Sequence, residues 1–132
     1  MTLPGDTSAA EQLAVDAARC AAERNCEDVV VLDLRELSPL TDFFVICTGT
    51  SDRQMRAVAD DVDELAEGLG HKKFGQSGRD IGQWILLDYV DVVVHFFDAE
   101  RRNYYDLEML WGDAQRIDWA LADPTPSEPD TP

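Results

Sequence analysis

The sequence has no long hydrophobic run and no basic, apolar leader. Hydrophobic residues make up 45% of its 132 positions, yet no apolar stretch approaches the roughly 20 residues that a membrane-spanning helix requires. The first residues, MTLPGDTSAAEQ, lack the positive segment and apolar core of a secretion signal. We therefore expect a cytoplasmic protein, with a chain long enough for one compact domain.

Cysteine and histidine are also scarce. Cys20, Cys26 and Cys47 form an odd set without a CxxC spacing. This set offers too few ligands for a zinc site, so we expect buried, reduced thiols. The histidines are His71 and His95, and no GxSxG motif supplies the nucleophile that a hydrolytic base needs. The sequence thus predicts no catalytic residue, no metal and no cofactor.

Positive charge is in short supply as well. The chain has 27 acidic and 11 basic residues, which gives a net charge of −16. Such a field repels a phosphate backbone, so direct binding of DNA is disfavoured. A basic protein partner would instead be attracted and steered, although acidity could also serve solubility alone.

The hydrophobic pattern predicts one α/β domain over residues 8–117, between a flexible leader at 1–7 and a disordered, acidic, proline-rich tail at 118–132. Ser8 and Glu11 fit a capping box that opens the first helix. The expected order is α-β-β-α-β-β-β-α, which indicates a mixed sheet of about five strands with helices packed on it. The helices are expected at 8–24, 51–68 and 103–111, and the strands at 28–34, 42–48, 71–76, 84–87 and 92–97.

One pattern resembles an enzyme site. Nucleotidyltransferases hold a nucleotide and a metal with a glycine-serine turn and paired aspartates, and the turn at 49–51 precedes Asp61 and Asp63 at about that separation. That chemistry needs both aspartates on a strand, where positions i and i+2 share a face. Here both fall in a predicted helix, where these positions point roughly 200° apart. A nucleotide-binding enzyme therefore remains only an alternative hypothesis, and Ser51 is interpreted as a helix cap.

Residues 82–111 carry more large side chains than one core needs, interleaved with carboxylates. An aromatic surface ringed by acids is typical of a site for another macromolecule. Asp88 and Asp91 flank Tyr89 in a predicted hairpin turn, where the carboxylates can pair with a basic partner around an aromatic anchor. They could also merely solvate the turn. The predicted contact residues are Trp84, Asp88, Tyr89, Asp91, His95, Tyr105 and Trp111.

These residues belong to a longer set of motifs. The segments TDFFVICTGTS at 41–51, WILLDY at 84–89 and DVVVHFF at 91–97 are followed by Arg102, Tyr104-Tyr105, Leu107-Glu108 and Leu110-Trp111. With this spacing, residues 27–114 resemble the ribosomal silencing factor family, also called Iojap-like proteins. The resemblance implies a nucleotidyltransferase-like fold that is not known to retain catalysis.

The resemblance also implies a function. Members of that family bind the large ribosomal subunit through its ribosomal protein number fourteen, at the subunit interface. They block joining of the small subunit and so repress translation when nutrients are scarce, and homodimers are common among them. A dimeric adaptor unrelated to ribosomes, joined through sheet edges, is the other alternative.

The chain departs from the family pattern at two places. Val90 stands where the family usually has glycine after Tyr89, and a β-branched residue resists positive φ. We therefore expect the turn to use another geometry, which could move Asp91. The loop before Trp84 usually carries a Glu-Gly pair, but here residues 77–80 read Ser-Gly-Arg-Asp.

Overall fold

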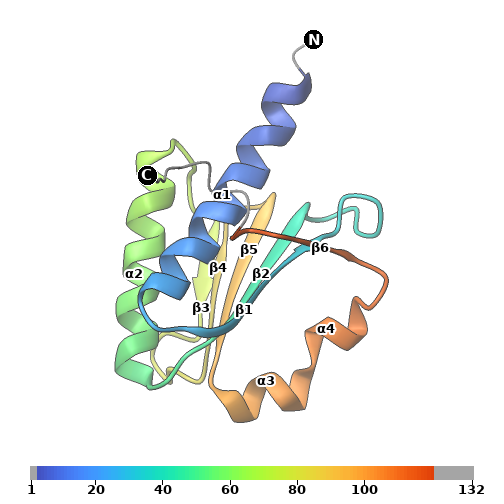
Figure 1. Ribbon diagram of the computed structural model, residues 1–132. Coiled ribbons are helices and arrows are strands. Elements are labelled where there is room, and N and C mark those ends of the chain that lie inside the picture. Colours follow the sequence, from blue (N-terminus) through green and yellow to red (C-terminus); the bar gives the residue numbers. More distant parts are fainter. Residues whose placement is uncertain (1–2, 121–132) are drawn as a thin grey trace, which may run out of the picture.

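The computed structural model describes residues 3–120, and its centre is a six-stranded mixed sheet (Figure 1). The strands lie in the order β3-β4-β5-β2-β1-β6. β2 and β5 pair in parallel, and each other neighbouring pair is antiparallel. The predicted α/β class is therefore confirmed. The bounds are β1 (Glu27–Asp33), β2 (Phe43–Thr48), β3 (Gly75–Ser77), β4 (Trp84–Asp88), β5 (Val92–Phe97) and β6 (Gln115–Ile117).

Two long helices, α1 (Leu3–Glu23) and α2 (Asp52–Gly68), pack on the same face of the sheet (Figure 1). Small side chains let α1 lie close to the strands, since Ala14 and Ala17 keep no exposed area. α2 buries one apolar face, made of Met55, Val58, Ala59, Val62 and Ala66. These two helices therefore cover one face of the sheet and form the main hydrophobic core with it.

The start of α2 follows the predicted capping pattern. Ser51 Oγ accepts a hydrogen bond from the backbone N–H of Gln54 at 3.0 Å, and Gln54 Oε1 accepts one from the backbone N–H of Thr50 at 2.9 Å. These bonds satisfy donors at the start of the helix that have no partner within it. The turn at 49–51 thus serves as a helix cap.

α1 begins earlier than the sequence predicts. It starts at Leu3, so the predicted start at Ser8 is wrong, and residues 3–7 of the expected leader are helical. Pro4 is compatible with this start, because an N–H in the first helical turn has no intrahelical partner to lose. Across residues 3–120, no helix combines the length and the apolar character needed to cross a membrane.

The predicted helix at 103–111 is also wrong in its bounds. It is two short helices, α3 (Ala99–Tyr105) and α4 (Leu107–Leu110), separated by Asp106. Asp106 has φ 47°, and its side chain caps α4, as that of Asp98 caps α3. Aspartate favours such breaks because its carboxylate competes for nearby backbone N–H groups.

The C-terminal part of the domain adds a strand that the sequence did not reveal. β6 pairs with β1 over three residues, and Trp119 packs on the main core and donates to the carbonyl of Val29 at 3.0 Å. Trp119 was placed in the predicted tail, so the folded part extends past 117. Residues 121–132 lie outside the described residues, and their disorder stays a prediction.

Candidate partner-binding surface

The other face of the sheet is only partly covered. α3 and α4 lie on the opposite side of the sheet from α1 and α2 (Figure 1). These short helices cover that face incompletely, so the strands present side chains that are neither buried nor fully solvated. We call this surface the open sheet face and define it by its partly exposed residues, Phe44, Trp84, Leu86, Asp88 and Val93.

Aromatic rings pack against one another where the open sheet face meets α3 and α4. The ring of Trp84 stacks on the ring of buried Phe97, with centroids 4.9 Å apart. The ring of Tyr105, from α3, also packs on Trp84, with centroids 4.6 Å apart. Phe44 contacts Trp111 edge to face at 6.1 Å. Tyr105 is 44% exposed, and Trp84 and Trp111 are partly exposed. The structure thus brings together three predicted contact residues, Trp84, Tyr105 and Trp111.

His95 lies beneath this cluster and is buried, with only 3% of its surface exposed. Trp84 Nε1 donates a hydrogen bond to His95 Nδ1 at 3.1 Å, which leaves the imidazole proton on Nε2. Burial lowers the pKa of His95 to about 4, so the ring is neutral at physiological pH. His95 therefore orients Trp84 from below and presents no surface of its own.

Tyr89 points away from the open sheet face. It is 5% exposed, and its hydroxyl donates to Asp63 Oδ1 of α2 at 2.7 Å. Lys73 Nζ donates to the other oxygen of Asp63 at 3.0 Å. Burial and the bond to the carboxylate of Asp63 raise the pKa of Tyr89. The expected outward anchor is thus an inward tether between the hairpin turn and α2, because residue 89 follows the alternation of buried Ile85 and Leu87.

The turn after Tyr89 carries the acidic rim of the surface. Asp91 is exposed, and its carbonyl accepts from the backbone N–H groups of Asp42 and Phe43 at 2.9 and 3.0 Å. Burial, and next the charge of Asp91, raise the pKa of the Asp42 carboxyl. The carboxylates of Asp42, Asp88 and Asp91 therefore gather at one end of the open sheet face.

Val90 in this turn has φ 74°. The expectation that a β-branched residue would force another geometry is therefore wrong. Asp88 Oδ1 accepts from the N–H of Val90 at 2.8 Å, and the N–H of Asp91 donates to the carbonyl of Tyr89 at 2.9 Å. The turn keeps a conformation suited to glycine with valine in place.

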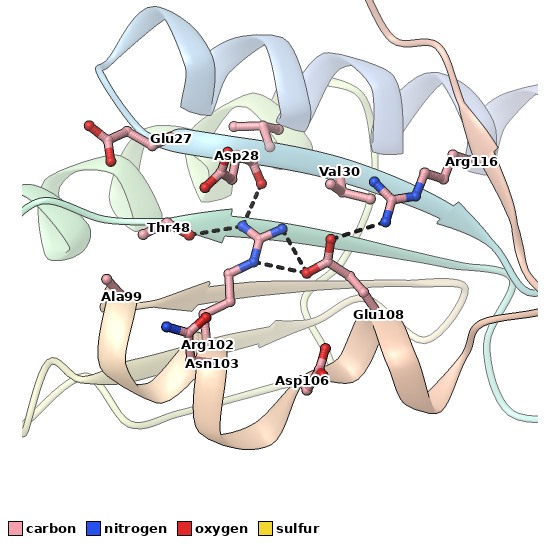
Figure 2. A pocket seen from close by; sticks show the side chains of 11 residues that line it. Glu27, Asp28, Val30, Thr48, Ala99, Arg102, Asn103, Asp106, Glu108 and Arg116 are labelled. Carbon is pink, nitrogen blue, oxygen red and sulfur yellow. Dashed lines mark hydrogen bonds and ion pairs between the residues drawn. The ribbon is translucent and has the colours of Figure 1, made fainter.

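Arg102 is the residue of this region that residue-level reasoning missed. Arg102 is only 9% exposed, and its guanidinium reaches from α3 to the sheet, where Nη1 donates to Thr48 Oγ1 at 2.8 Å and also to the carbonyl of Asp28 (Figure 2). Nη2 pairs with Glu108 of α4 at 3.0 Å. Arg102 thus fixes both short helices to the sheet, and its only sequence signal was its place in the family-like motif.

The same arginine lines a cavity of about 540 Å³ between β1, β2, α3 and β6 (Figure 2). Glu108 binds both arginines of its lining, Arg102 at 3.0 Å and Arg116 at 3.3 Å. Both arginines are neutralised by Glu108 of the same chain, so we interpret the cavity as a place where α3, α4 and the sheet are joined and not as a ligand site.

The two aspartates of the enzyme hypothesis lie in α2 and face different neighbours. Asp61 pairs with Arg24, the residue that follows α1, at 2.7 Å, whereas Asp63 binds Tyr89 and Lys73. They therefore do not converge on a common site. The three cysteines are buried and carry free thiols, as predicted.

Comparisons with known proteins agree with this architecture. Residues 7–131 match the family model described as "Ribosomal silencing factor during starvation". A Bacillus subtilis protein named ribosomal silencing factor RsfS is 42% identical over 106 residues, which are 80% of this chain and 89% of that protein. The chloroplastic protein Iojap of Arabidopsis thaliana is 35% identical, over 83% of this chain and 46% of that protein. A crystal structure of a Chromobacterium violaceum protein superimposes with a TM-score of 0.70 at 35% identity, covering 78% of this chain and 83% of that one.

Proposed function

The chain belongs to the ribosomal silencing factor family, and from this premise we propose that it binds the large ribosomal subunit and prevents the small subunit from joining. The family is a non-enzymatic one that binds ribosomes, so the chain is not an enzyme. The proposed contact is the basic ribosomal protein number fourteen at the subunit interface. A protein with this role acts where ribosomes are, so we also propose a cytoplasmic location.

The observation that carries the proposal is the open sheet face itself. A soluble protein rarely leaves a contiguous aromatic surface in water unless another macromolecule covers it. Here Trp84 and Phe44 lie on a sheet whose other face is completely packed. Tryptophan and tyrosine are the side chains that most often dominate binding energy at protein interfaces.

Charge supports a basic partner for this surface. The acidic rim lies at one end of the open sheet face, and the whole chain carries a net charge of −16. Opposite charge speeds the encounter of two proteins and fixes their orientation. We propose that Asp91 and Asp88 pair with basic groups of the partner while Trp84, Tyr105 and Trp111 supply the apolar contact. Tyr89 and His95 support this surface from within.

Repression follows from occupancy and needs no chemical step. A domain docked on the joining surface of one subunit occupies the volume that the other subunit must enter. The strength of repression is then set by the fraction of large subunits that carry the protein.

We also propose that the free protein is a homodimer. The adaptor hypothesis required pairing through sheet edges, but both edge strands, β3 and β6, are only three residues long. Short edges offer few backbone hydrogen bonds for another strand. A dimer would therefore use the faces of the domain, and sedimentation equilibrium of the purified protein tests this.

Replacing Asp91 by lysine is expected to weaken binding to the large subunit by about 10- to 100-fold, because the substitution places a like charge against a basic partner. Binding is measured by co-sedimentation of the purified protein with large subunits across a concentration series. The matched control is Glu64→Lys, an equal charge change at an exposed position of α2, which lies on the other side of the sheet.

Equal losses in the two variants would mean that net charge, and not the open sheet face, governs binding. A subunit-joining assay completes the test, with the protein added before the small subunit. Normal joining at saturating protein would refute occlusion. Pull-down with purified ribosomal protein number fourteen separates that partner from other components of the subunit.

A further inference from the structure

The β4–β5 turn keeps a backbone strain that its own sequence could have avoided. At φ 74° Val90 lies in the left-handed region, which glycine enters freely and a β-branched side chain enters at a cost. The hydrogen bond from the N–H of Asp91 to the carbonyl of Tyr89 closes a γ-turn around Val90. This form of γ-turn is rare and strained.

Neighbouring contacts hold the strained turn in place. The carboxylate of Asp88 accepts from the N–H of Val90, the N–H of Tyr89 donates to the carbonyl of Val92 at 2.9 Å, and Tyr89 is tied to Asp63 of α2 at 2.7 Å. Strain of this kind persists only where the surroundings over-determine the conformation. The backbone at 90 therefore stays in a glycine-like state whatever its side chain is.

Packing inside the domain does not account for the valine. Its side chain is 49% exposed, whereas neighbouring Tyr89 and Val92 are 5% and 1% exposed. The isopropyl group projects from the tip of the hairpin, between Asp88 and the exposed Asp91. It is an apolar group set within the acidic rim, continuous with the open sheet face.

We propose that Val90 is a specificity-determining contact residue for the basic partner. This inference rests on the proposed function and assigns the isopropyl group to the interface, beside the charge pairs of Asp88 and Asp91. An apolar contact within a ring of charge pairs is desolvated on binding and strengthens them. The strained γ-turn then presents a rigid contact, so little conformational entropy is lost when the partner docks.

The test compares three variants in co-sedimentation with large ribosomal subunits. Val90→Gly removes the isopropyl group and the strain, and Val90→Ala removes two methyl groups while keeping a Cβ at positive φ. We expect each to bind about five-fold more weakly, which corresponds to about 1 kcal/mol of lost apolar burial. Ile81→Ala is the matched control, because Ile81 is 69% exposed but lies in the loop before β4, at the other end of that strand.

Thermal unfolding separates the contact from folding. The unfolding midpoint of Val90→Gly is expected to equal or exceed that of the parent, since glycine relieves the backbone strain. Weaker binding together with an undiminished midpoint supports the inference, and unchanged affinity in Val90→Gly and Val90→Ala overturns it. If the parent chain itself fails to bind large subunits, the proposed function falls and this inference falls with it. If the parent binds and both Val90 variants bind equally well, the proposed function stands and only this inference falls.

Discussion

Replacing Arg102 by methionine is expected to lower the free energy of unfolding by about 3–5 kcal/mol, the usual cost of breaking a buried ion pair from one side. Arg102 is 9% exposed, and its guanidinium binds Thr48, the carbonyl of Asp28 and the carboxylate of Glu108 (Figure 2). Methionine fills a similar volume but leaves the carbonyl and the carboxylate without their shared donor. Urea denaturation followed by tryptophan fluorescence measures the change.

Arg116→Met is the matched control for this substitution. Arg116 contacts the same carboxylate of Glu108 at 3.3 Å, but its side chain is 62% exposed. Exposed ion pairs contribute about 0–1 kcal/mol, so this variant should remain close to the parent. A parental unfolding free energy in Arg102→Met would show that α3 and α4 are held by apolar packing alone.

Lowering the pH from 7 to 4 is expected to cost about 3 kcal/mol of stability through His95. Its pKa is about 4 in the folded chain and about 6.5 when unfolded. Between these values the unfolded chain binds a proton that the folded chain does not, so stability falls as pH falls. The stability linked to the neutral His95 is therefore fully present above about pH 6.5 and is lost progressively down to about pH 4.

A comparison with His95→Gln isolates this effect from the carboxylates, which titrate in both proteins. Glutamine can still accept the hydrogen bond of Trp84 but cannot be protonated. Unfolding free energies from urea melts at several pH values should therefore fall less steeply in the variant. Parallel pH profiles for the two proteins would show that the buried imidazole gains a proton without unfolding.

The sequence predicted most of the regular elements because their hydrophobic periods are unambiguous. The stripe from Met55 to Val62 has the spacing of one helix only. The apolar runs of β2 and β5 contain one polar residue each, Thr48 and His95, which is too few for the polar face of a surface helix. The break at Asp106 escaped because the residues around it have helical preferences. Arg102, which fixes both short helices to the sheet, has partners on strands distant in the sequence.

The candidate surface was predicted only in part. Alternation along β4 places Trp84 on the face of Leu86 and Asp88, and all three are partly exposed in the structure. The same alternation places Tyr89 on the face of Ile85, but the expectation of an outward anchor overrode it. The positive φ of Val90 was unpredictable from local preference, since it is imposed by Asp88 and by the tether to Asp63. Whether these residues contact a partner stays a prediction.

The middle of the sheet has a consequence for how the polypeptide is made. The parallel pairing of β2 with β5 joins residues 43–48 to residues 92–97, and Arg102 reaches back 74 positions to Asp28. A nascent chain cannot close the centre of its sheet until nearly all of these residues have left the exit tunnel. Before then β2 lacks its central neighbour and exposes apolar side chains, a state prone to aggregation. Closure of this sheet therefore waits until β5 and Arg102 have been synthesised and released from the tunnel.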